Sequence, residues 1–342
     1  MILAMLIAFY LLAEVCEKYF VESLEKISES LKLSPEASGA TLMAVGSSAP
    51  ELFVSLMALF KPGAEAMGAG TIIGSAIFNI LVITGASVAV RQALVIWQPV
   101  IRDMLFYSLS IILLLFSFRD GVISLPEILT FLLLYAIYIT AVINWKKIFK
   151  YEDDNPIEIL EVAMTERKWR RIFTPINWLV KITFPKSDKY ILSFFISIAW
   201  ITLLSWVLVE SAVVSANILG IPSVIIGLTI LATGTSIPDL LSSIIVAKKG
   251  QTGMAISNGI GSNIFDILFA LGFPWLIAYV FLGQKITVVT DNLTSSVILL
   301  FATVIAMLFL FIIRKWRIGK YSGYFLIALY LIYLGWVIIG SI

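Results

Sequence analysis

Two short stretches of this sequence place an acid, hydroxyl groups and a proline inside apolar runs long enough to cross a bilayer. The first reads GSSAPE and ends at Glu51, and the second reads GTSIPD and ends at Asp239. Pro50 and Pro238 each remove one helical hydrogen bond, and the neighbouring glycines and hydroxyls favour local unwinding. A helix broken in this way presents carboxylate, hydroxyl and carbonyl oxygens, which are ligands for hard cations such as Ca²⁺ and Na⁺.

A second pair of stretches offers the same kind of chemistry. GTIIGSAIFNIL contains Ser75 and Asn79, and SNGIGSNIFDIL contains Ser262 and Asp266. The two residues of each pair lie four positions apart, so they share one face of a helix. The hydroxyl and carboxylate residues of the first two stretches have the same spacing. Four helices are therefore expected to present oxygen ligands toward one another.

These ligands form one candidate cation site. The residues expected to contribute are Glu51, Asp239, Asp266, Asn79, Ser47, Thr235, Ser75 and Ser262 through side chains, and Ala44 and Ala232 through freed carbonyl groups. Of the 22 acidic residues, we place only the three named here deep within predicted spans, and no basic residue accompanies them. Three bare carboxylates in a bilayer cost about 2.5–3.5 kcal/mol each. Bound cations offset that cost, and a charge of −3 balances one Ca²⁺ with one monovalent ion, or three Na⁺.

The rest of the chain must hold these residues in a membrane. Hydrophobic residues make up 60% of the 342 positions and charged residues 13%. Apolar runs of about 20 residues recur along the sequence, which is typical of a polytopic helical membrane protein and not of a transmembrane barrel. The chain has no histidine and one cysteine, Cys16, which excludes an internal disulfide, a cysteine cluster for a metal, and histidine chemistry.

Apolar segments and turn residues predict ten membrane-spanning helices. Their expected limits are 1–22, 36–60, 66–90, 98–118, 123–146, 190–215, 222–247, 253–282, 293–313 and 321–341. The first run lacks a basic segment and a cleavage site, so we expect a membrane helix there and not a signal peptide. If the N-terminus is outside, 21 of the 24 basic residues fall in the inner connections. The positive-inside rule then predicts extracellular termini and a cytoplasmic central loop.

The paired stretches also indicate an internal repeat. Glu51 and Asp239 lie 188 positions apart, and Asn79 and Asp266 lie 187 apart. The predicted domains are a first five-helix repeat at 1–146, a cytoplasmic linker at 147–189 and a second five-helix repeat at 190–342. Because five is an odd number, the second repeat enters the membrane from the opposite side. The expected fold is all-α, with ten transmembrane helices in two inverted repeats and broken helices at the ion site.

The four stretches resemble the two alpha repeats of cation/Ca²⁺ exchangers and are most similar to those of potassium-dependent sodium/calcium exchangers. That branch also resembles this chain outside the repeats, in EVCEKYFVESLEKISESLKLS, RDMLFYSLSIILLLF and TPINWLVKITFPKSDKY. The resemblance implies an antiporter in the plasma membrane that exports Ca²⁺ in exchange for Na⁺ by alternating access.

The resemblance also implies roles for individual residues. Glu51 and Asp239 match the Ca²⁺-binding acids of these exchangers. Ser48 and Ser236 match further hydroxyl ligands beside the helix breaks. Asp266 matches an acid tied to K⁺ in the potassium-dependent branch, which permits K⁺ cotransport without requiring it.

Three other functions stay open at this point. A H⁺/Ca²⁺ antiporter is the nearest alternative, because the same carboxylates can exchange protons. A passive cation channel is a second, although paired broken helices in an inverted repeat favour an alternating transporter. An intramembrane aspartyl protease would use Asp239 and Asp266 as a catalytic pair, but it leaves Glu51 unexplained. We expect a transporter and not an enzyme.

The expected partners are inorganic cations and the lipid bilayer, with no cofactor, no nucleic acid and no obligatory protein partner. The transported ions are Ca²⁺ and Na⁺, with or without K⁺. The first and sixth spans carry no ligand-type residues in their apolar parts, and we expect them to slide and open the site to either side. Glu14, Glu17 and Glu210, near the ends of these spans, are assigned to the interface or an access path. Small residues in the second pair of stretches are assigned to close helix packing: Gly70, Gly74, Gly259 and Gly261.

Overall fold

The computed structural model is almost entirely helical. It describes residues 2–30, 44–61, 64–94, 96–148, 180–185, 189–248, 252–283, 286–288 and 291–339. Most of the predicted linker at 147–189 and the beginning of the predicted span 36–60 lie outside the described residues.

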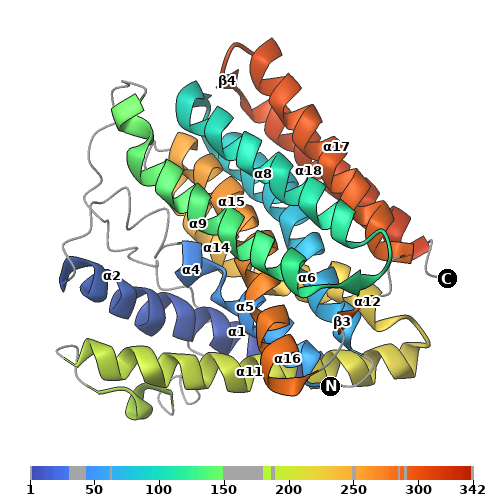
Figure 1. Cartoon of the computed structure of the whole chain (residues 1–342). Coiled ribbons are helices and arrows are strands. Elements are labelled where there is room, and N and C mark those ends of the chain that lie inside the picture. Colours follow the sequence, from blue (N-terminus) through green and yellow to red (C-terminus); the bar gives the residue numbers. More distant parts are fainter. Residues whose placement is uncertain are drawn as a thin grey trace.

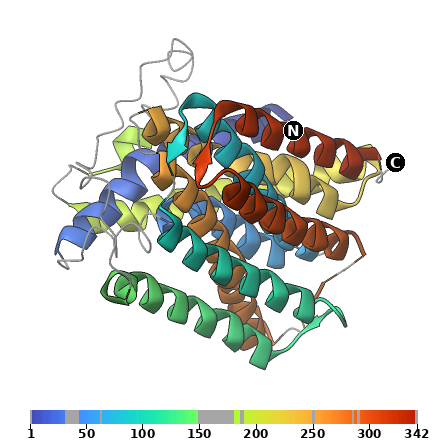
Figure 2. The same cartoon turned by 90° about the horizontal axis from the view of Figure 1, so that it is seen from above.

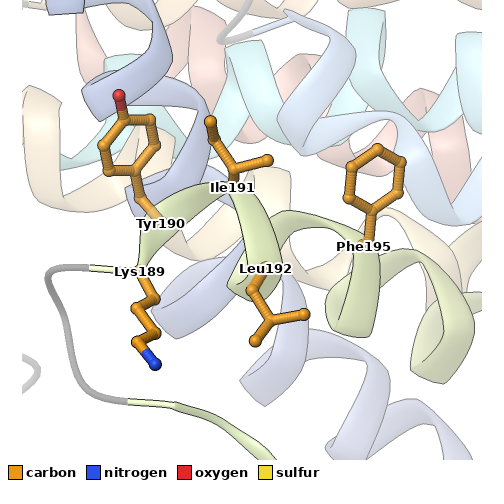
Figure 3. A pocket seen from close by; sticks show the side chains of 5 residues that line it. All are labelled: Lys189, Tyr190, Ile191, Leu192 and Phe195. Atoms are coloured by element: carbon orange, nitrogen blue, oxygen red, sulfur yellow. The ribbon is translucent and has the colours of Figure 1, made fainter.

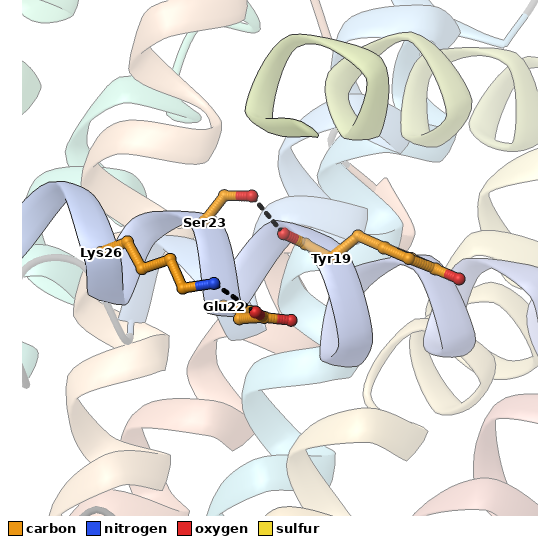
Figure 4. Close-up of polar contacts among 4 residues, drawn as sticks. All are labelled: Tyr19, Glu22, Ser23 and Lys26. Carbon is orange, nitrogen blue, oxygen red and sulfur yellow. Dashed lines mark hydrogen bonds and ion pairs between the residues drawn. The ribbon is translucent and has the colours of Figure 1, made fainter. Parts of the chain in front are cut away.

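The N-terminal helix extends beyond its predicted end at residue 22. It consists of α1 (Ile2–Val15), a π-helical turn η1 (Cys16–Phe20) and α2 (Val21–Ser30). Figure 4 shows two contacts that support the polar extension. Lys26 Nζ donates to Glu22 Oε1 at 2.6 Å, and Ser23 Oγ donates to the Tyr19 carbonyl at 2.5 Å. An ion pair at i,i+4 adds about 0.2–0.5 kcal/mol to a helix, so helical structure continues where the apolar run stops.

Two helices are broken beside the prolines. Their parts are α4 (Ala44–Ser47) and α5 (Ala49–Leu59) in the first half, and α12 (Ser223–Ile226), η5 (Gly227–Leu231), α13 (Ala232–Thr235) and α14 (Ile237–Lys248) in the second. The breaks fall at Ser48, with φ −95° and ψ 10°, and at Ser236, with φ −86° and ψ 2°. Each lies two residues before a proline that lacks the N–H needed to continue the helix. The sequence therefore predicted both interruptions.

Two further helices contain a π-helical turn that begins at a predicted ligand. The first comprises α6 (Glu65–Phe78), η3 (Asn79–Ile83) and α7 (Thr84–Val90), and the second comprises α15 (Thr252–Phe265), η6 (Asp266–Ala270) and α16 (Gly272–Leu282). Turns of this kind insert one extra residue into a helix and often mark functional positions. No feature of the sequence predicted these two turns.

The remaining helices are long and connected by short ribbons. They are α8 (Trp97–Ser117), α9 (Leu125–Ile148), α11 (Tyr190–Leu219), α17 (Asp291–Ile313) and α18 (Lys320–Ile339). The strands are β1 (Ala93–Leu94), β2 (Val122–Ile123), β3 (Ile286–Thr287) and β4 (Arg317–Ile318). β1 pairs antiparallel with β4, with Ala93 opposite Ile318, and β2 pairs antiparallel with β3, with Ile123 opposite Ile286.

Seven helices in the described part of the chain are long and apolar enough to cross a membrane. They cover Ala66–Val90, Trp97–Ser117, Leu125–Trp145, Tyr190–Leu219, Ala255–Phe281, Leu293–Ile313 and Lys320–Ile339. The segments Ala49–Leu59 and Ser223–Thr235 are apolar but shorter, because the breaks divide them. The fold is thus that of a helical protein with several candidate membrane spans.

The helices form two groups that pack differently. Figure 1 shows α1 and α11 side by side along the lower edge of the molecule, while α8, α9, α17 and α18 run obliquely above them. Figure 2 gives the same arrangement from above. The α1/α11 pair belongs to an apolar cluster that includes Leu12 and Leu208, and the other helices share a second cluster that includes Ile77 and Phe265. The broken helices lie between the two groups, where α5 contacts α11 and α13 contacts α1.

Candidate functional site

Glu51 connects the two broken helices. It lies in the first turn of α5, and its side chain is fully buried. Glu51 Oε1 accepts hydrogen bonds from Ser75 Oγ at 2.9 Å and from Ser236 Oγ at 3.0 Å. Ser75 comes from α6, Ser236 lies at the break of the second-half helix, and the two hydroxyls also contact each other. Residues from both halves of the chain therefore meet at one carboxylate oxygen.

Asp266 and Asp239 extend this group of acids. Asp266 is the first residue of η6 and is fully buried, and Asp239 is buried in the first turn of α14. The Asp266 carboxylate interacts electrostatically with both Glu51 and Asp239, and Ser48 lies beside it. The positive ends of α5 and α14 favour the anionic forms of Glu51 and Asp239. The structure thus brings three carboxyl groups near one another, and they repel one another when all three are ionised.

Buried oxygens at this place lack hydrogen-bond donors. Among the described residues, none donates to Ser48 Oγ, Glu51 Oε2, Asn79 Oδ1 or either carboxylate oxygen of Asp266. An unsatisfied buried polar group costs about 1–3 kcal/mol, and more when it carries charge. Native structures rarely leave several such oxygens together unless an ion or water completes them. The donor set consists of carboxylate, amide and hydroxyl oxygens, which fits Ca²⁺ or Na⁺.

The carboxylates alone do not enclose an ion. In the described part of the chain, no three acidic or cysteine side chains lie close enough to hold one metal ion among them. Hydroxyl, amide and carbonyl oxygens would have to complete a coordination shell. Ca²⁺ commonly uses about six to eight oxygens from mixed sources, so this arrangement suits it.

The other predicted ligands lie on the same elements. Thr235 and Ser262 are buried on α13 and α15. Ala44 is the first residue of α4, and the side chain of Ser47 lies outside what the structure describes.

The expectation that the Ala232 carbonyl is freed by the break is wrong for this structure. That carbonyl accepts a hydrogen bond from the Ser236 backbone N–H at 3.3 Å, and Thr235 Oγ1 lies 3.4 Å from it. The physical reason is that Pro238 removes the donor for the residue four positions earlier, Gly234, and not for Ala232. Ala232 keeps its second carbonyl lone pair, so its assignment as a ligand stays a prediction.

The burial of a further acid, Asp103, escaped the sequence analysis. Asp103 in α8 is buried, and it accepts hydrogen bonds from Arg102 Nε at 2.8 Å and from Tyr138 Oη at 3.2 Å. Asp103 lies in the second turn of α8, so the expectation of three acids deep in the spans stays a prediction. Arg102 and Asp103 open the stretch RDMLFYSLSIILLLF, which the sequence analysis quoted only for its resemblance to the exchangers. Asp103 thus has a cationic partner, Arg102.

The acids near the ends of α1 and α11 also have lysine partners. Glu14 forms an ion pair with Lys18 on its own helix. Glu210 on α11 forms an ion pair with Lys61, at the end of α5, with 2.5 Å between Nζ and Oε2. Both acids thus have a lysine partner. Their assignment to an interface or access path stays a prediction.

Close helix packing requires glycine at Gly70 and Gly74, as predicted, but not at Gly259 and Gly261. A Cβ on Gly70 would lie 2.8 Å from the Val224 carbonyl oxygen, and one on Gly74 would overlap the Leu228 carbonyl. A Cβ on Gly259 or Gly261 would make only ordinary contacts, at 3.6 and 3.5 Å. Close approach to the second broken helix therefore requires glycine on α6, whereas α15 leaves room for a methyl group.

A surface pocket lies apart from the buried acids. It is formed at the beginning of α11 by Lys189, Tyr190, Ile191, Leu192 and Phe195 (Figure 3). None of the predicted cation ligands lines it.

Comparison with known proteins identifies the family of this chain. A family model described as sodium/calcium exchanger protein matches residues 1–144 and 189–339. The chain belongs to the sodium/calcium exchanger family. This family consists of transporters and not of enzymes. The match leaves out most of the predicted linker and includes all twelve predicted ligands.

Curated relatives of this exchanger-family chain have names that include potassium. Human sodium/potassium/calcium exchanger 4 is 28% identical, with 97% of this chain and 80% of the relative covered. Human sodium/potassium/calcium exchanger 5 is 32% identical, with 86% of this chain and 75% of the relative covered. A solved structure of the sodium-calcium exchanger NCX_Mj, soaked with Na⁺ and Sr²⁺, is 27% identical with a TM-score of 0.60 over 97% of this chain and 96% of that one. The resemblance to cation/Ca²⁺ exchangers is confirmed.

Proposed function

We propose that this chain is an antiporter that exports Ca²⁺ in exchange for Na⁺ by alternating access. The observation that carries the proposal is the group of buried oxygens without donors, from Glu51, Asn79 and Asp266, at the meeting point of the two broken helices. Membership of the sodium/calcium exchanger family supports the choice of ions. No resident cofactor is required, because the cations are the substrates.

The ligand assignment follows the geometry of the site. Glu51 and Asp239 bind Ca²⁺ from the first turns of α5 and α14, and Asp266 and Asn79 contribute from the π-helical turns. The hydroxyl and carbonyl ligands are those of Ser47, Ser48, Ser75, Thr235, Ser236, Ser262, Ala44 and Ala232. Because Ca²⁺ and Na⁺ use the same carboxylates, occupancy by one ion excludes the other, which is the basis of exchange.

The architecture that we assign is ten spans in two inverted five-helix repeats. Equivalent packing on both sides supports it: α5 packs on α6 as α14 packs on α15, and α7 contacts α18 as α16 contacts α9. The ribbon register gives independent support. The pair Ala93 and Ile318 corresponds to the pair Ile286 and Ile123 when β1 is matched with β3 and β4 with β2.

Opening of the site is assigned to movement of α1 and α11 over the other helices. These two helices pack against each other and share an apolar cluster separate from the main one. Apolar side chains that meet across such a boundary can slide with small changes in contact. Cross-links that fix α1 and α11 to the core should block exchange, and full exchange in the cross-linked protein would refute this assignment.

The orientation follows from the distribution of basic residues. Extracellular termini and a cytoplasmic loop at 147–189 place the broken helices between a Na⁺-rich exterior and the cytoplasm, with the protein in the plasma membrane. The domains are assigned as before, with repeats at 1–146 and 190–342.

The deciding experiment is Ca²⁺ uptake into proteoliposomes loaded with Na⁺. External K⁺ is present or replaced by an inert cation, and a pH gradient is imposed in a separate series. Uptake that requires internal Na⁺ supports the proposal, and a further requirement for external K⁺ assigns Asp266 to K⁺ cotransport. Uptake driven by a proton gradient alone would replace the proposal with H⁺/Ca²⁺ antiport.

A further inference from the structure

Asn79 is held by a chain of buried polar groups that the ligand set does not include. Asn79 Nδ2 donates to Asn263 Oδ1 at 2.9 Å. Asn263 Nδ2 donates in turn to the Ala76 carbonyl at 3.0 Å and to Tyr107 Oη at 2.9 Å. All four residues are fully buried. These hydrogen bonds lead from η3 through α15 to α8, so the series begins at the cation site and ends outside the ligand helices.

This series of hydrogen bonds determines which atom of Asn79 faces the site. An amide side chain has an accepting oxygen on one branch and a donating nitrogen on the other. Two acceptors, the Ala76 carbonyl and Tyr107 Oη, hold the nitrogen of Asn263 and turn its oxygen toward Asn79. That oxygen in turn holds the nitrogen of Asn79. Asn79 Oδ1 is thereby left without a donor among the described residues, free to bind a cation.

The two halves of the chain differ in their need for a residue that orients the ligand side chain. The position equivalent to Asn263 is Ala76, and the position equivalent to Asn79 is Asp266, 187 residues away in each case. A carboxylate presents an oxygen in either orientation, so Asp266 needs no orienting partner, and Ala76 supplies none. An amide presents N–H groups when it is reversed, and these repel a cation.

We infer that Asn263 and Tyr107 are positioning residues that orient Asn79 as an oxygen ligand for Ca²⁺. The inference rests on the proposed Na⁺/Ca²⁺ exchange and adds two residues that act on the ion through Asn79. Tyr107 acts on Asn79 only through Asn263. Without the Tyr107 hydroxyl, Asn263 Nδ2 still has the Ala76 carbonyl as an acceptor, so loss of Tyr107 Oη should have a smaller effect than loss of Asn263.

The test is a Ca²⁺ titration by calorimetry of the purified full chain in Na⁺-free detergent buffer. N263L removes the oxygen that holds Asn79 and should raise the dissociation constant for Ca²⁺ about tenfold, while Y107F should raise it about two- to threefold. The decisive comparison repeats both substitutions in an N79D background. A carboxylate at position 79 needs no orientation, so neither substitution should weaken binding there.

A purely structural role makes the opposite prediction. Looser packing of α15 would weaken Ca²⁺ binding by the same factor in both backgrounds, and that result would overturn the inference, as would unchanged binding in N263L and Y107F. Thermal unfolding without ions checks that each variant is folded, and Y107F carries the test if N263L does not fold. If the wild-type protein binds and exchanges Ca²⁺, and the substitutions weaken Ca²⁺ binding equally in both backgrounds, only this inference is refuted. A wild-type chain that binds no Ca²⁺ refutes the proposed function and the inference together.

Discussion

The two halves of the molecule present related positions with different chemistry. In the first half, Glu51 shares one oxygen with two hydroxyls, and Asn79 is a neutral amide held by a chain of hydrogen bonds. In the second half, Asp266 is a carboxylate to which no described residue donates a hydrogen bond. An amide in one half and an acid in the other make the site asymmetric in charge. The related stretches of the two halves therefore contribute different charges to the one proposed site.

The largest expected effect comes from removing the acids beside the two breaks. E51A and D239A should each abolish Na⁺-dependent Ca²⁺ uptake, because each removes a charged ligand that no neighbour replaces. E51Q and D239N keep the volume and should weaken the apparent Ca²⁺ affinity by about 10- to 100-fold. Uptake into Na⁺-loaded proteoliposomes measures both. E210Q, which changes an acid on α11 outside the ligand set, is the matched control, and retained transport in E51A or D239A would sink the site assignment.

Making the halves equal in charge should have the next largest effect. D266N places an amide where the first half has Asn79, so the site loses one negative charge and the capacity to balance one monovalent cation. Where external K⁺ stimulates uptake by the wild-type protein, we expect D266N to abolish that stimulation and to raise the Ca²⁺ concentration for half-maximal uptake less than about tenfold. The measurement is uptake with K⁺ or an inert cation outside. Stimulation by K⁺ that persists in D266N would separate this acid from K⁺.

A steric comparison of the halves uses Gly74 and its equivalent, Gly261. A methyl group on Gly74 would lie 2.7 Å from the Ala232 Cβ, whereas one on Gly261 would lie 3.5 Å from Tyr138 Oη. We expect G74A to destabilise the protein by about 1–3 kcal/mol, because neither the Leu228 backbone nor Ala232 can move aside easily. G261A should change the stability by less than about 0.5 kcal/mol. Thermal unfolding in detergent measures both, and equal shifts in the two variants would contradict the structure at this crossing.

Particular residues show what the sequence was able to predict. Pro50 and Pro238 predicted the two breaks because a missing N–H acts locally. α8 and α17 begin and end close to their predicted limits, since an apolar run is also a local property. The burial of Asp103 was missed, because the sequence does not show whether a neighbouring Arg–Asp pair lies in water or between α8 and α9.

The parts of the candidate site that depend on long-range contacts were also missed. Asn263 stands in a stretch that the sequence analysis quoted, but its partners Ala76, Asn79 and Tyr107 are at least 156 positions away. The π-helical turns at Asn79 and Asp266 depend on how α6 and α15 pack against other helices. Pairing between distant segments is decided by the folded arrangement, so residue types and local spacing carry little information about it.

The smallest expected effect comes from breaking the ion pair between Lys61 and Glu210, which connects the two halves of the chain. Lys61, just after α5, forms an ion pair with Glu210 on α11, whereas Glu14 on α1 pairs with Lys18 on η1 of the same N-terminal helix. Both members of the first pair are about one-third exposed, with 34% and 36% of their side-chain surfaces accessible, and exposed ion pairs contribute about 0.2–1 kcal/mol. K61M and E210Q should lower the stability within that range at low salt and less at high salt. Of these two pairs, that of Lys61 and Glu210 connects different helices. A double-variant cycle of K61M and E210Q should therefore give a coupling free energy between the two side chains. Each variant should change the exchange rate by no more than about twofold. K18M is the matched control. An effect of K18M on the exchange rate larger than that of K61M would show that the contact within the N-terminal helix matters more than the one between helices.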